Sequence, residues 1–203
     1  TSRIAGSPTM KVGATVDRLR RSGIEVIDFG AGEPDFSTPD AIKVAAHQAL
    51  DANFTRYTPV AGIADLRKAI CDRYRADYGV DYKENQVIAT AGGKQALYNT
   101  ALSLFGPGDE VITHSPCWPT IPEQVKLADA TPVYARTHVD EGFSVHAQAI
   151  LDAVTPRPRG ITVPSPGNPT GAPIAEGALR TRAECAENPT VGRVDALCPA
   201  HTG

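Results

Sequence analysis

Residues 160–171 read Gly-Ile-Thr-Val-Pro-Ser-Pro-Gly-Asn-Pro-Thr-Gly, an apolar run followed by a turn rich in proline and glycine. The run predicts a strand over residues 160–164. Proline fixes φ and glycine permits positive φ, so residues 165–171 predict a short rigid turn. Such a turn holds one side chain at a set place and angle, and here that side chain is the amide of Asn168. We interpret the turn as part of a ligand-binding site.

Apolar runs and helical patterns alternate along the chain before this turn. Further strands are predicted at residues 25–29, 86–91, 110–113 and 132–136. Helices are predicted at residues 9–22, 38–52, 62–78, 93–105, 119–129 and 146–154. This alternation is typical of an α/β fold, in which a largely parallel sheet is covered by helices.

Two of the helices carry more specific expectations. Thr38 is a favourable N-cap residue, so we expect it to begin the helix at 38–52. In the helix at 62–78, apolar residues recur at helical spacing and predict one buried stripe. The residues of this stripe are Ile63, Leu66, Ile70 and Tyr74.

The composition is that of an ordinary globular protein. Of the 203 residues, 41% are hydrophobic and 21% are charged, and the formal net charge is −3. This charge gives no electrostatic reason to expect a nucleic-acid or membrane partner. No apolar run has the length of a membrane span or a signal segment. The four cysteines have no disulfide-framework or metal-site spacing and indicate reduced thiols, so we expect a cytoplasmic protein.

Glycines at a strand-to-helix junction form a second candidate site. Residues 92–94 read Gly-Gly-Lys at the point where the strand 86–91 meets the next helix. Bare backbone N–H groups at a helix N-terminus bind phosphate, and Lys94 adds positive charge there. The alternative is a plain turn in which the glycines serve only the backbone geometry.

Trp118 is a third candidate. It is the single tryptophan of the chain, and it follows the strand 110–113 at the end where α/β sheets bind their ligands. Its flat face can stack on an aromatic ligand ring. The alternative is a tryptophan that packs on the surface of its own domain.

Two loops nearer the N-terminus give weaker signals. Residues 32–36 read Gly-Glu-Pro-Asp-Phe, a tight loop whose backbone N–H groups, beginning at Gly32, can receive a carboxylate. Residues 57–62 form a turn before a helix, and Tyr57 there is either a packing residue or a phosphate donor. Taken alone, both patterns favour a structural role.

The order of these motifs resembles that of the class I and II aminotransferases, which are fold type I pyridoxal-phosphate enzymes. Among them, the chain looks most like bacterial aspartate aminotransferases. The resemblance covers residues 4–179. The motifs are Gly-Glu-Pro-Asp-Phe at 32–36, the turn at 57–62, Gly-Gly-Lys-Gln-Ala-Leu at 92–97, Pro-Gly-Asp-Glu-Val at 107–111, Ser-Pro-Cys-Trp at 115–118 and Asn-Pro-Thr-Gly at 168–171.

This resemblance implies an incomplete large domain of the family fold and pyridoxal 5'-phosphate as the cofactor. It places Gly93 and Lys94 at the cofactor phosphate. It stacks Trp118 on the pyridine ring, and it makes Asn168 a hydrogen-bond partner of the phenolic oxygen of that ring. The implied reaction is amino-group transfer between an amino acid and a 2-oxo acid.

The resemblance also implies contacts to the substrate and to a second subunit. The substrate carboxylate would meet the backbone N–H of Gly32 and the side chains of Trp118 and Asn168. Tyr57 would reach the cofactor phosphate of the partner subunit, which implies a homodimer. Lys94 favours an acidic substrate.

The resemblance stops at the residues that carry the covalent chemistry. In the family, a Schiff-base lysine that holds the cofactor lies well beyond Asn-Pro-Thr-Gly. None of the lysines here matches its motif; they are Lys11, Lys43, Lys68, Lys83, Lys94 and Lys126. The resemblance thus implies a truncated chain without a catalytic lysine, and we expect no transamination from it alone. Two other interpretations stay open: a C–S lyase of the same superfamily, and a non-catalytic remnant that binds cofactor.

Composition divides the chain into three parts. Residues 1–50 predict an N-terminal arm and lead-in, and residues 51–180 a partial large cofactor-binding domain. Residues 181–203 have no clear period and stay unassigned. Within them, Asp195 is either the acidic partner of the cofactor ring nitrogen or a solvated aspartate. A frameshift near residue 180 is our hypothesis for the loss of pattern.

Overall fold

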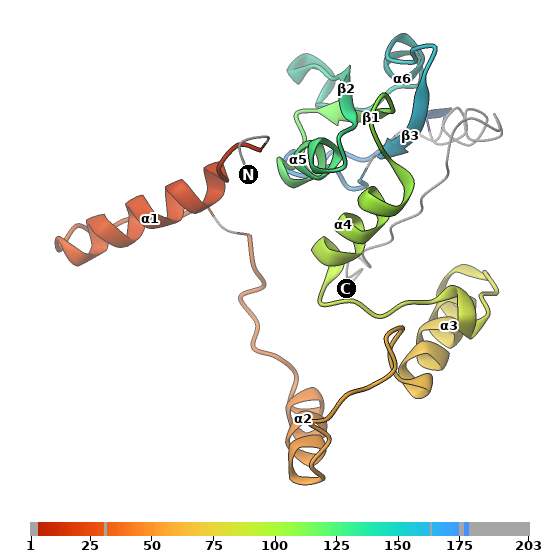
Figure 1. Ribbon diagram of the computed structural model, residues 1–203. Helices are drawn as coiled ribbons and strands as arrows, with labels where there is room; N and C mark the ends of the chain where they lie inside the picture. Colours follow the sequence, from red (N-terminus) through yellow and green to blue (C-terminus); the bar gives the residue numbers. More distant parts are fainter. Residues whose placement is uncertain (1–3, 31, 163, 175–176, 179–203) are drawn as a thin grey trace. The chain divides into compact units, whose positions relative to one another are not determined.

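The computed structural model describes residues 4–30, 32–162, 164–174 and 177–178 (Figure 1). The chain divides into two compact units, each described below by itself. One unit consists of residues 8–90, and the other of the described residues among 1–7 and 91–203. The expectations for Asp195 and for residues 181–203 lie outside the described residues, and the domain limits predicted at residues 50 and 180 stay predictions.

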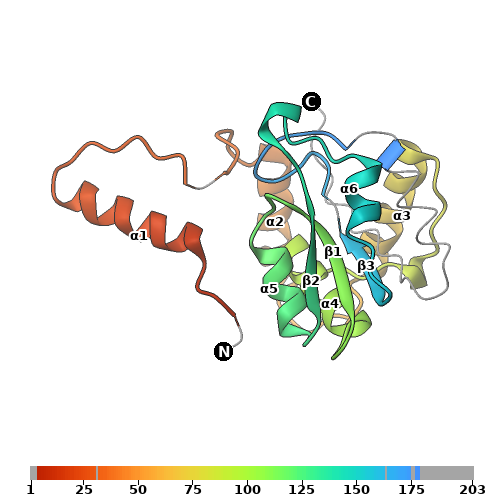
Figure 2. The ribbon, with the colours of Figure 1, turned by 90° about the horizontal axis from the view of Figure 1, so that it is seen from above.

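A three-stranded parallel sheet forms the centre of the second unit (Figure 2). Its strands are β1 (Glu110–Ser115), β2 (Thr131–Arg136) and β3 (Pro158–Thr162), and their order in the sheet is β2-β1-β3. β1 is therefore the central strand and pairs with β2 along its full length. The α/β class and the parallel sheet predicted from the sequence are confirmed.

Side chains of β1 are buried on both faces of the sheet, as a central parallel strand requires. On one face, Ile112 packs in a cluster that includes Ile150 and Ile161. On the other face, Val111 packs with Val125 and Ala130. Both Val111 and Ile112 are 0% exposed, so β1 supplies the centre of both cores.

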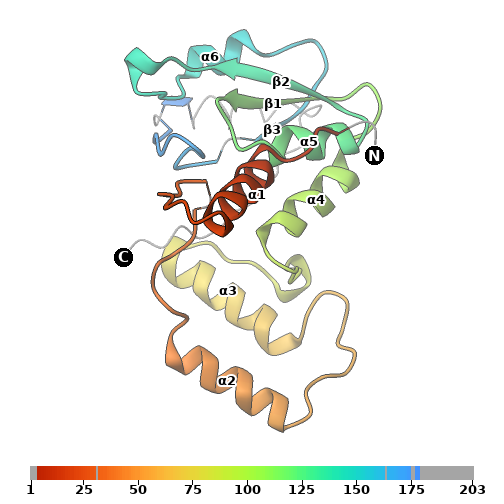
Figure 3. The ribbon, with the colours of Figure 1, turned by 90° about the vertical axis from the view of Figure 1, so that its left-hand side faces the viewer.

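Helices cover the two faces of the sheet (Figure 3). α6 (Ala147–Asp152) contributes Ile150 to the first face, where the backbone also pairs in parallel between Val145 and Ile174. α5 (Thr120–Leu127) packs on the opposite face, and α4 (Gly93–Leu104) packs against α5. A short 3-10 helix, η2 (Val139–Glu141), follows β2.

A polar network holds the amino ends of β1 and β3 together. The carboxylate of Glu110 accepts a hydrogen bond from the Thr155 hydroxyl and lies 3.4 Å from a guanidinium nitrogen of Arg157. The backbone N–H of Glu110 donates to the Arg157 carbonyl at 3.3 Å. These polar contacts lie at the opposite end of the strands from the candidate site residues, so we assign them a structural role.

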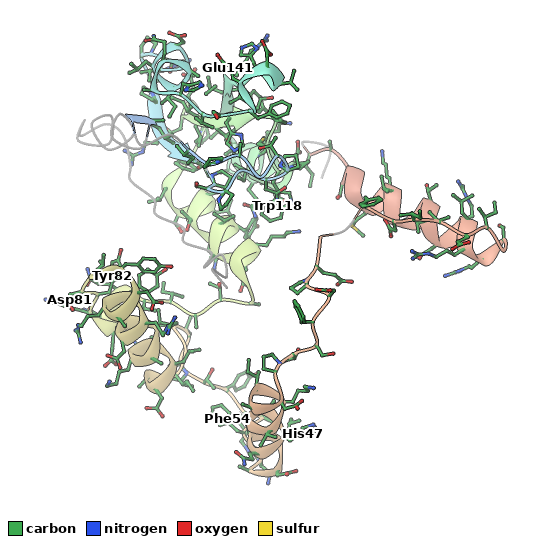
Figure 4. All side chains as sticks on the ribbon, turned by 180° about the vertical axis from the view of Figure 1, so that it is seen from behind. His47, Phe54, Asp81, Tyr82, Trp118 and Glu141 are labelled. Atoms are coloured by element: carbon green, nitrogen blue, oxygen red, sulfur yellow. The ribbon has the colours of Figure 1, made fainter. Side chains whose placement is uncertain are left out.

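The other unit contains three helices and a 3-10 turn. They are α1 (Pro8–Arg21), α2 (Asp40–Asp51), α3 (Ala64–Tyr78) and η1 (Glu84–Gln86). α3 ends at Gly79, whose φ of 66° is the left-handed value that glycine accepts at a helix C-terminus. Tyr82, labelled in Figure 4, folds back so that its ring meets Tyr74 of α3 edge-on, at 5.3 Å between ring centres.

All the predicted helices are present, but two predicted strands are not. In the predicted ranges 25–29 and 86–91, no residue has a ladder partner among the described residues. Gln86 instead ends the 3-10 helix η1, and the N–H of Ala89 donates to the Ala61 carbonyl at 2.9 Å. A strand exists only where a second strand pairs with it, and a local apolar run cannot supply that partner. These two predictions were therefore wrong for the structure as described.

Two finer expectations for the helices were also wrong. The N-cap of α2 is Pro39 and not Thr38, and no side chain caps this helix by a hydrogen bond. In the predicted stripe of α3, Leu66 is 45% exposed, and Cys71 is the buried residue of the helix. None of the described helices combines the length and apolar character needed to cross a bilayer.

We expect Gly160→Ala to destabilise the sheet. A Cβ on Gly160 would lie 2.8 Å from both Cε1 and Cζ of Phe105, so the added methyl overpacks the face that holds Val111. The expected loss is about 1–3 kcal/mol in the free energy of unfolding, measured by urea titration. Gly106→Ala is the control, because a Cβ there meets nothing within 4 Å and its φ is not in the left-handed region. Equal stability of both variants would contradict the packing described.

Candidate functional site

The carboxyl edge of the sheet carries two of the predicted site residues. β1 ends at Ser115 and continues into the loop with Trp118, while β3 ends at Thr162 and continues into the turn with Asn168. The two strands are neighbours and run parallel, so both segments leave the sheet at the same edge (Figure 2). In open α/β sheets this edge is the usual ligand-binding position.

Short backbone hydrogen bonds make residues 165–171 a tight turn, as predicted. Gly167 N–H donates to the Ala172 carbonyl at 2.7 Å, and Gly171 N–H donates to the Gly167 carbonyl at 2.6 Å. Gly171 has a φ of 73°, which glycine adopts without strain. Gly167 is buried and Asn168 is exposed. The turn thus presents the Asn168 amide to solvent from a fixed backbone.

The segment after the turn anchors it to the core. The side chains of Ala172, Ile174 and Ala178 are buried, and the last two belong to the cluster around Ile112. The N–H of Ile174 also reaches back to the Ser165 hydroxyl at 3.4 Å. The turn is therefore held on both sides, by β3 before it and by these apolar residues after it.

The start of α4 is open for an anion. Its N-cap is Gly92, with φ 81°, and no side chain caps the helix by a hydrogen bond. Gln95 instead folds back, and its side-chain oxygen accepts from the N–H of Ala91 at 2.6 Å. Gly93 and Lys94 are both exposed at this end.

The first turn of α4 carries a positive charge, whereas the helix dipole favours negative charge at this end. α2, α3 and α5 each carry an acidic residue in the first turn, which the helix dipole stabilises. α4 has no acidic residue there and has Lys94. A cation next to the positive end of the helix dipole is stabilised when an anion binds between the uncapped N–H groups and the ammonium group.

Lys94 and Trp118 contact each other directly. The ammonium nitrogen of Lys94 lies 5.1 Å from the centre of the Trp118 ring, within the range of a cation–π interaction. Trp118 is half-buried, and Figure 4 shows it at the sheet-bearing unit. The structure thus brings the Gly-Gly-Lys and Ser-Pro-Cys-Trp motifs together, although they are separate in sequence.

Gln124 is a contributor that sequence reasoning missed. Its side chain is 7% exposed, and its amide nitrogen donates to the Lys94 carbonyl at 3.0 Å. This hydrogen bond fixes the start of α4 to α5, the helix that follows Trp118. One feature of the sequence could have identified Gln124. It is a polar residue between Ile121 and Val125, on the buried side of the helix.

Burial shifts the pKa values of two side chains near this edge. Burial lowers the pKa of the His114 imidazole below its usual 6.5, and a hydrogen bond with the Pro116 backbone partly opposes this. Burial raises the pKa of the Cys117 thiol, so the protonated thiol predominates at neutral pH. Among the described ranges, no three His, Cys, Asp or Glu side chains gather in a way that suits a metal ion.

Gly32 and Tyr57 belong to the other unit. Gly32 is exposed, and a Cβ on it would meet nothing within 4 Å. The ring of Tyr57 is fully exposed, at 108% of the reference area. The turn that follows Tyr57 ends at Gly62, whose φ is 98°. A Cβ on Gly62 would lie 2.7 Å from the Cβ of Ala89, so the two backbones are close together there. The structure describes each of them within that unit alone.

We expect the stability of the sheet-bearing unit to fall as the pH is lowered from 6.5 to about 5, above the range of most carboxylates. The unfolded chain protonates His114 near pH 6.5, whereas the folded chain resists protonation because burial lowers the pKa. The unfolded state therefore binds more protons in this window, and stability is lost until the pH reaches the folded pKa. Urea midpoints at several pH values measure the slope.

His114→Asn should remove this component of the pH dependence, whatever its effect on stability at pH 7.5. His138→Asn is the matched control, because His138 is exposed in the same unit. The account of His114 is wrong if both variants keep the slope of the unaltered chain.

Curated relatives match most of this chain. The aspartate/prephenate aminotransferase of Cereibacter sphaeroides is 43% identical over 183 residues, which are 90% of this chain and 46% of that protein. The aspartate/prephenate aminotransferase of Thermus thermophilus is 41% identical over 180 residues, which are 89% of this chain and 47% of that protein. The chain thus spans about half the length of the curated relatives it matches.

Solved structures match the fold. The aspartate aminotransferase from Thermus thermophilus with maleate has a TM-score of 0.88 and 39% identity, over 92% of this chain and 50% of that one. The alanine aminotransferase from Pyrococcus furiosus has a TM-score of 0.82 and 30% identity, over 90% of this chain and 49% of that one. The family model described as aminotransferase class I and II matches residues 24–189. The chain therefore belongs to the family of class I and II aminotransferases.

Proposed function

We propose that this chain provides the cofactor-binding part of a pyridoxal-phosphate-dependent aminotransferase of the aspartate aminotransferase type. The reaction is amino-group transfer between an amino acid and a 2-oxo acid. The observation that carries the proposal is the contact of Lys94 with the Trp118 ring at the uncapped start of α4. The Asn168 turn leaves the sheet at the same edge as the Trp118 loop.

The residues at this edge fit a phosphorylated aromatic cofactor. The phosphate needs backbone N–H groups and positive charge, and the exposed Gly93 and Lys94 at the start of α4 fit both needs. The ring needs a flat apolar partner and a hydrogen-bond donor for its oxygen, which Trp118 and Asn168 supply. When bound, pyridoxal phosphate supplies an electron sink for loss of the Cα proton of the substrate.

In this proposal, the side chains at the carboxyl edge of the sheet orient the cofactor ring. They do not move the substrate proton. The Lys94 ammonium group contacts the Trp118 ring, and the Lys94 carbonyl accepts a hydrogen bond from Gln124 of α5, so the start of α4 is held beside the indole. Asn168 stands on a turn closed by hydrogen bonds of 2.7 and 2.6 Å, so the backbone that carries its amide is set before any ligand arrives. Such preorganisation lowers the entropy cost of binding.

The substrate carboxylate is assigned to Gly32, Trp118 and Asn168. Gly32 is exposed and a Cβ built on it would meet nothing within 4 Å, which supports a backbone open to a ligand there. The Lys94 charge favours a dicarboxylic substrate, as in an aspartate aminotransferase. The matched alanine aminotransferase shares the fold, so this preference rests on the site and not on the fold.

Tyr57 is assigned to the cofactor phosphate of a second copy of the chain. Its ring is fully exposed, so it does not pack on its own unit. The alternative role of Tyr57, as a packing residue, requires such packing. A large aromatic side chain without packing partners in its own chain is typical of an interface residue. This supports a homodimer with shared active sites.

We expect the purified chain to bind pyridoxal phosphate reversibly, with quenching of Trp118, its single tryptophan. Lys94→Ala removes the charge at the phosphate, and Asn168→Ala removes the ring partner. Each should weaken binding about tenfold, the equivalent of one charge-assisted hydrogen bond. Lys11→Ala and Asn99→Ala are matched controls, because both residues are exposed elsewhere on helices. Unchanged affinity in both site variants would exclude this site.

We also expect no steady-state transamination by the chain itself. None of its lysines matches the catalytic lysine motif of the family. The measurement is 2-oxoglutarate-dependent consumption of aspartate with added cofactor, compared with free cofactor alone. Turnover above that background would contradict the expectation, and Lys94→Ala would then show whether Lys94 is the reactive amine.

A further inference from the structure

The carbonyl group of Ser115, at the end of β1, accepts two hydrogen bonds from a single residue. That residue is Thr137, which directly follows β2. Its backbone nitrogen lies 3.1 Å and its hydroxyl oxygen 2.9 Å from the Ser115 carbonyl oxygen. A carbonyl oxygen has two lone pairs, so it can accept both bonds. The N–H bond continues the pairing of β1 with β2, and only the hydroxyl bond depends on the side chain.

Ser115 is also the residue at which the sheet releases β1. The register between β1 and β3 ends at Thr113, whereas the register between β1 and β2 continues to Ser115. The next residue, Pro116, has no backbone N–H and cannot donate a further ladder bond. At Ser115 the described strand pairing therefore comes from the β2 side alone, where Thr137 donates its two hydrogen bonds.

The Trp118 loop, residues 116–119, begins at this carbonyl group. Only Pro116 and Cys117 separate Ser115 from Trp118. On the other side, the Trp118 carbonyl accepts a hydrogen bond from the N–H of Ile121 at 3.1 Å, in the first turn of α5. Ile121 is 5% exposed, so the core anchors that side. The backbone of Trp118 thus lies between two held points, and the Ser115 carbonyl is one of them.

Strand preference and packing do not by themselves require threonine at position 137. Threonine and valine share a β-branched shape, and both are favoured in strands. Thr137 is half-buried, so a methyl group in place of its hydroxyl would be accepted there. The specific contribution of threonine is therefore its hydrogen bond to Ser115.

We propose that Thr137 is a positioning residue for the Trp118 ring. The inference rests on the proposed function, in which Trp118 stacks on the cofactor ring. Thr137 acts through the Ser115 carbonyl and not by contact with the cofactor. Without the hydroxyl, this carbonyl keeps the N–H bond alone, and the start of the Trp118 loop can pivot about it. The indole then samples more directions, and binding of the cofactor ring weakens.

The test titrates pyridoxal 5'-phosphate into the purified chain and follows the fluorescence of Trp118, its single tryptophan. Thr137→Val removes the hydroxyl and keeps the backbone N–H, whereas Thr137→Ser keeps both donors. We expect the valine variant to bind about fivefold more weakly, the equivalent of one neutral hydrogen bond. The serine variant should stay within about twofold of the unaltered chain.

Thr155→Val is the matched control for a general loss of stability. It removes a hydroxyl that donates to the Glu110 carboxylate, at the opposite end of β1. This variant should have a lower urea midpoint and an unchanged cofactor affinity. The proposal is overturned by unchanged affinity in Thr137→Val. It is also overturned if Thr137→Val loses no more affinity than Thr155→Val or Thr137→Ser.

Acrylamide quenching of Trp118 fluorescence without cofactor tests the positioning by itself. Quenching should increase in Thr137→Val and should match the unaltered chain in the other two variants. If the unaltered chain binds no cofactor, the proposed function fails, and equal quenching in all four chains would show that the positioning fails as well. If far-UV circular dichroism shows that Thr137→Val does not fold, Thr137→Ala removes the same hydroxyl and replaces it in both measurements.

Discussion

Burial of β1 on both faces is the constraint on which the sheet-bearing unit depends. Val111 points into one apolar cluster and Ile112 into the other, so the strand cannot shift register without exposing both. The strands on either side take their positions from it. The loop with Trp118 therefore begins at the most firmly held backbone of the unit, and the turn with Asn168 leaves the neighbouring strand at the same edge. Accurate placement of the two candidate site segments follows from an apolar constraint that involves no ligand.

Local sequence could predict much of this arrangement. Proline and glycine specify the 165–171 turn and the Gly-Gly-Lys junction within a few residues, so both are predictable from local sequence alone. Apolar runs likewise predict the strands β1, β2 and β3, and helical spacing of apolar residues predicts the helices. The strands expected at 25–29 and 86–91 did not form, because pairing needs a partner that a local run cannot provide. Gln124 was missed for a related reason, since it owes its importance to a contact distant in the sequence.

Membership of the class I and II aminotransferases accounts for the order of the six motifs. The family match covers residues 24–189 and includes all of them. The choice of substrate is less constrained, because matched structures with this fold include both aspartate and alanine aminotransferases. A fold shared by both kinds of enzyme does not fix the substrate, so the proposed preference for an acidic substrate rests on the Lys94 ammonium group beside Trp118.

The absence of buried residues in α2 contrasts with the burial of β1. A helix that buries no side chain is held by little more than its own backbone hydrogen bonds, so it opens at low free-energy cost. Opening of β1, in contrast, disrupts both apolar clusters at once. Amide hydrogens of α2 should thus exchange with solvent long before those of β1, and proteases should cut first around α2. The two units would then differ greatly in how long they stay folded. The unit that carries Trp118 and Asn168 would be the more stable one.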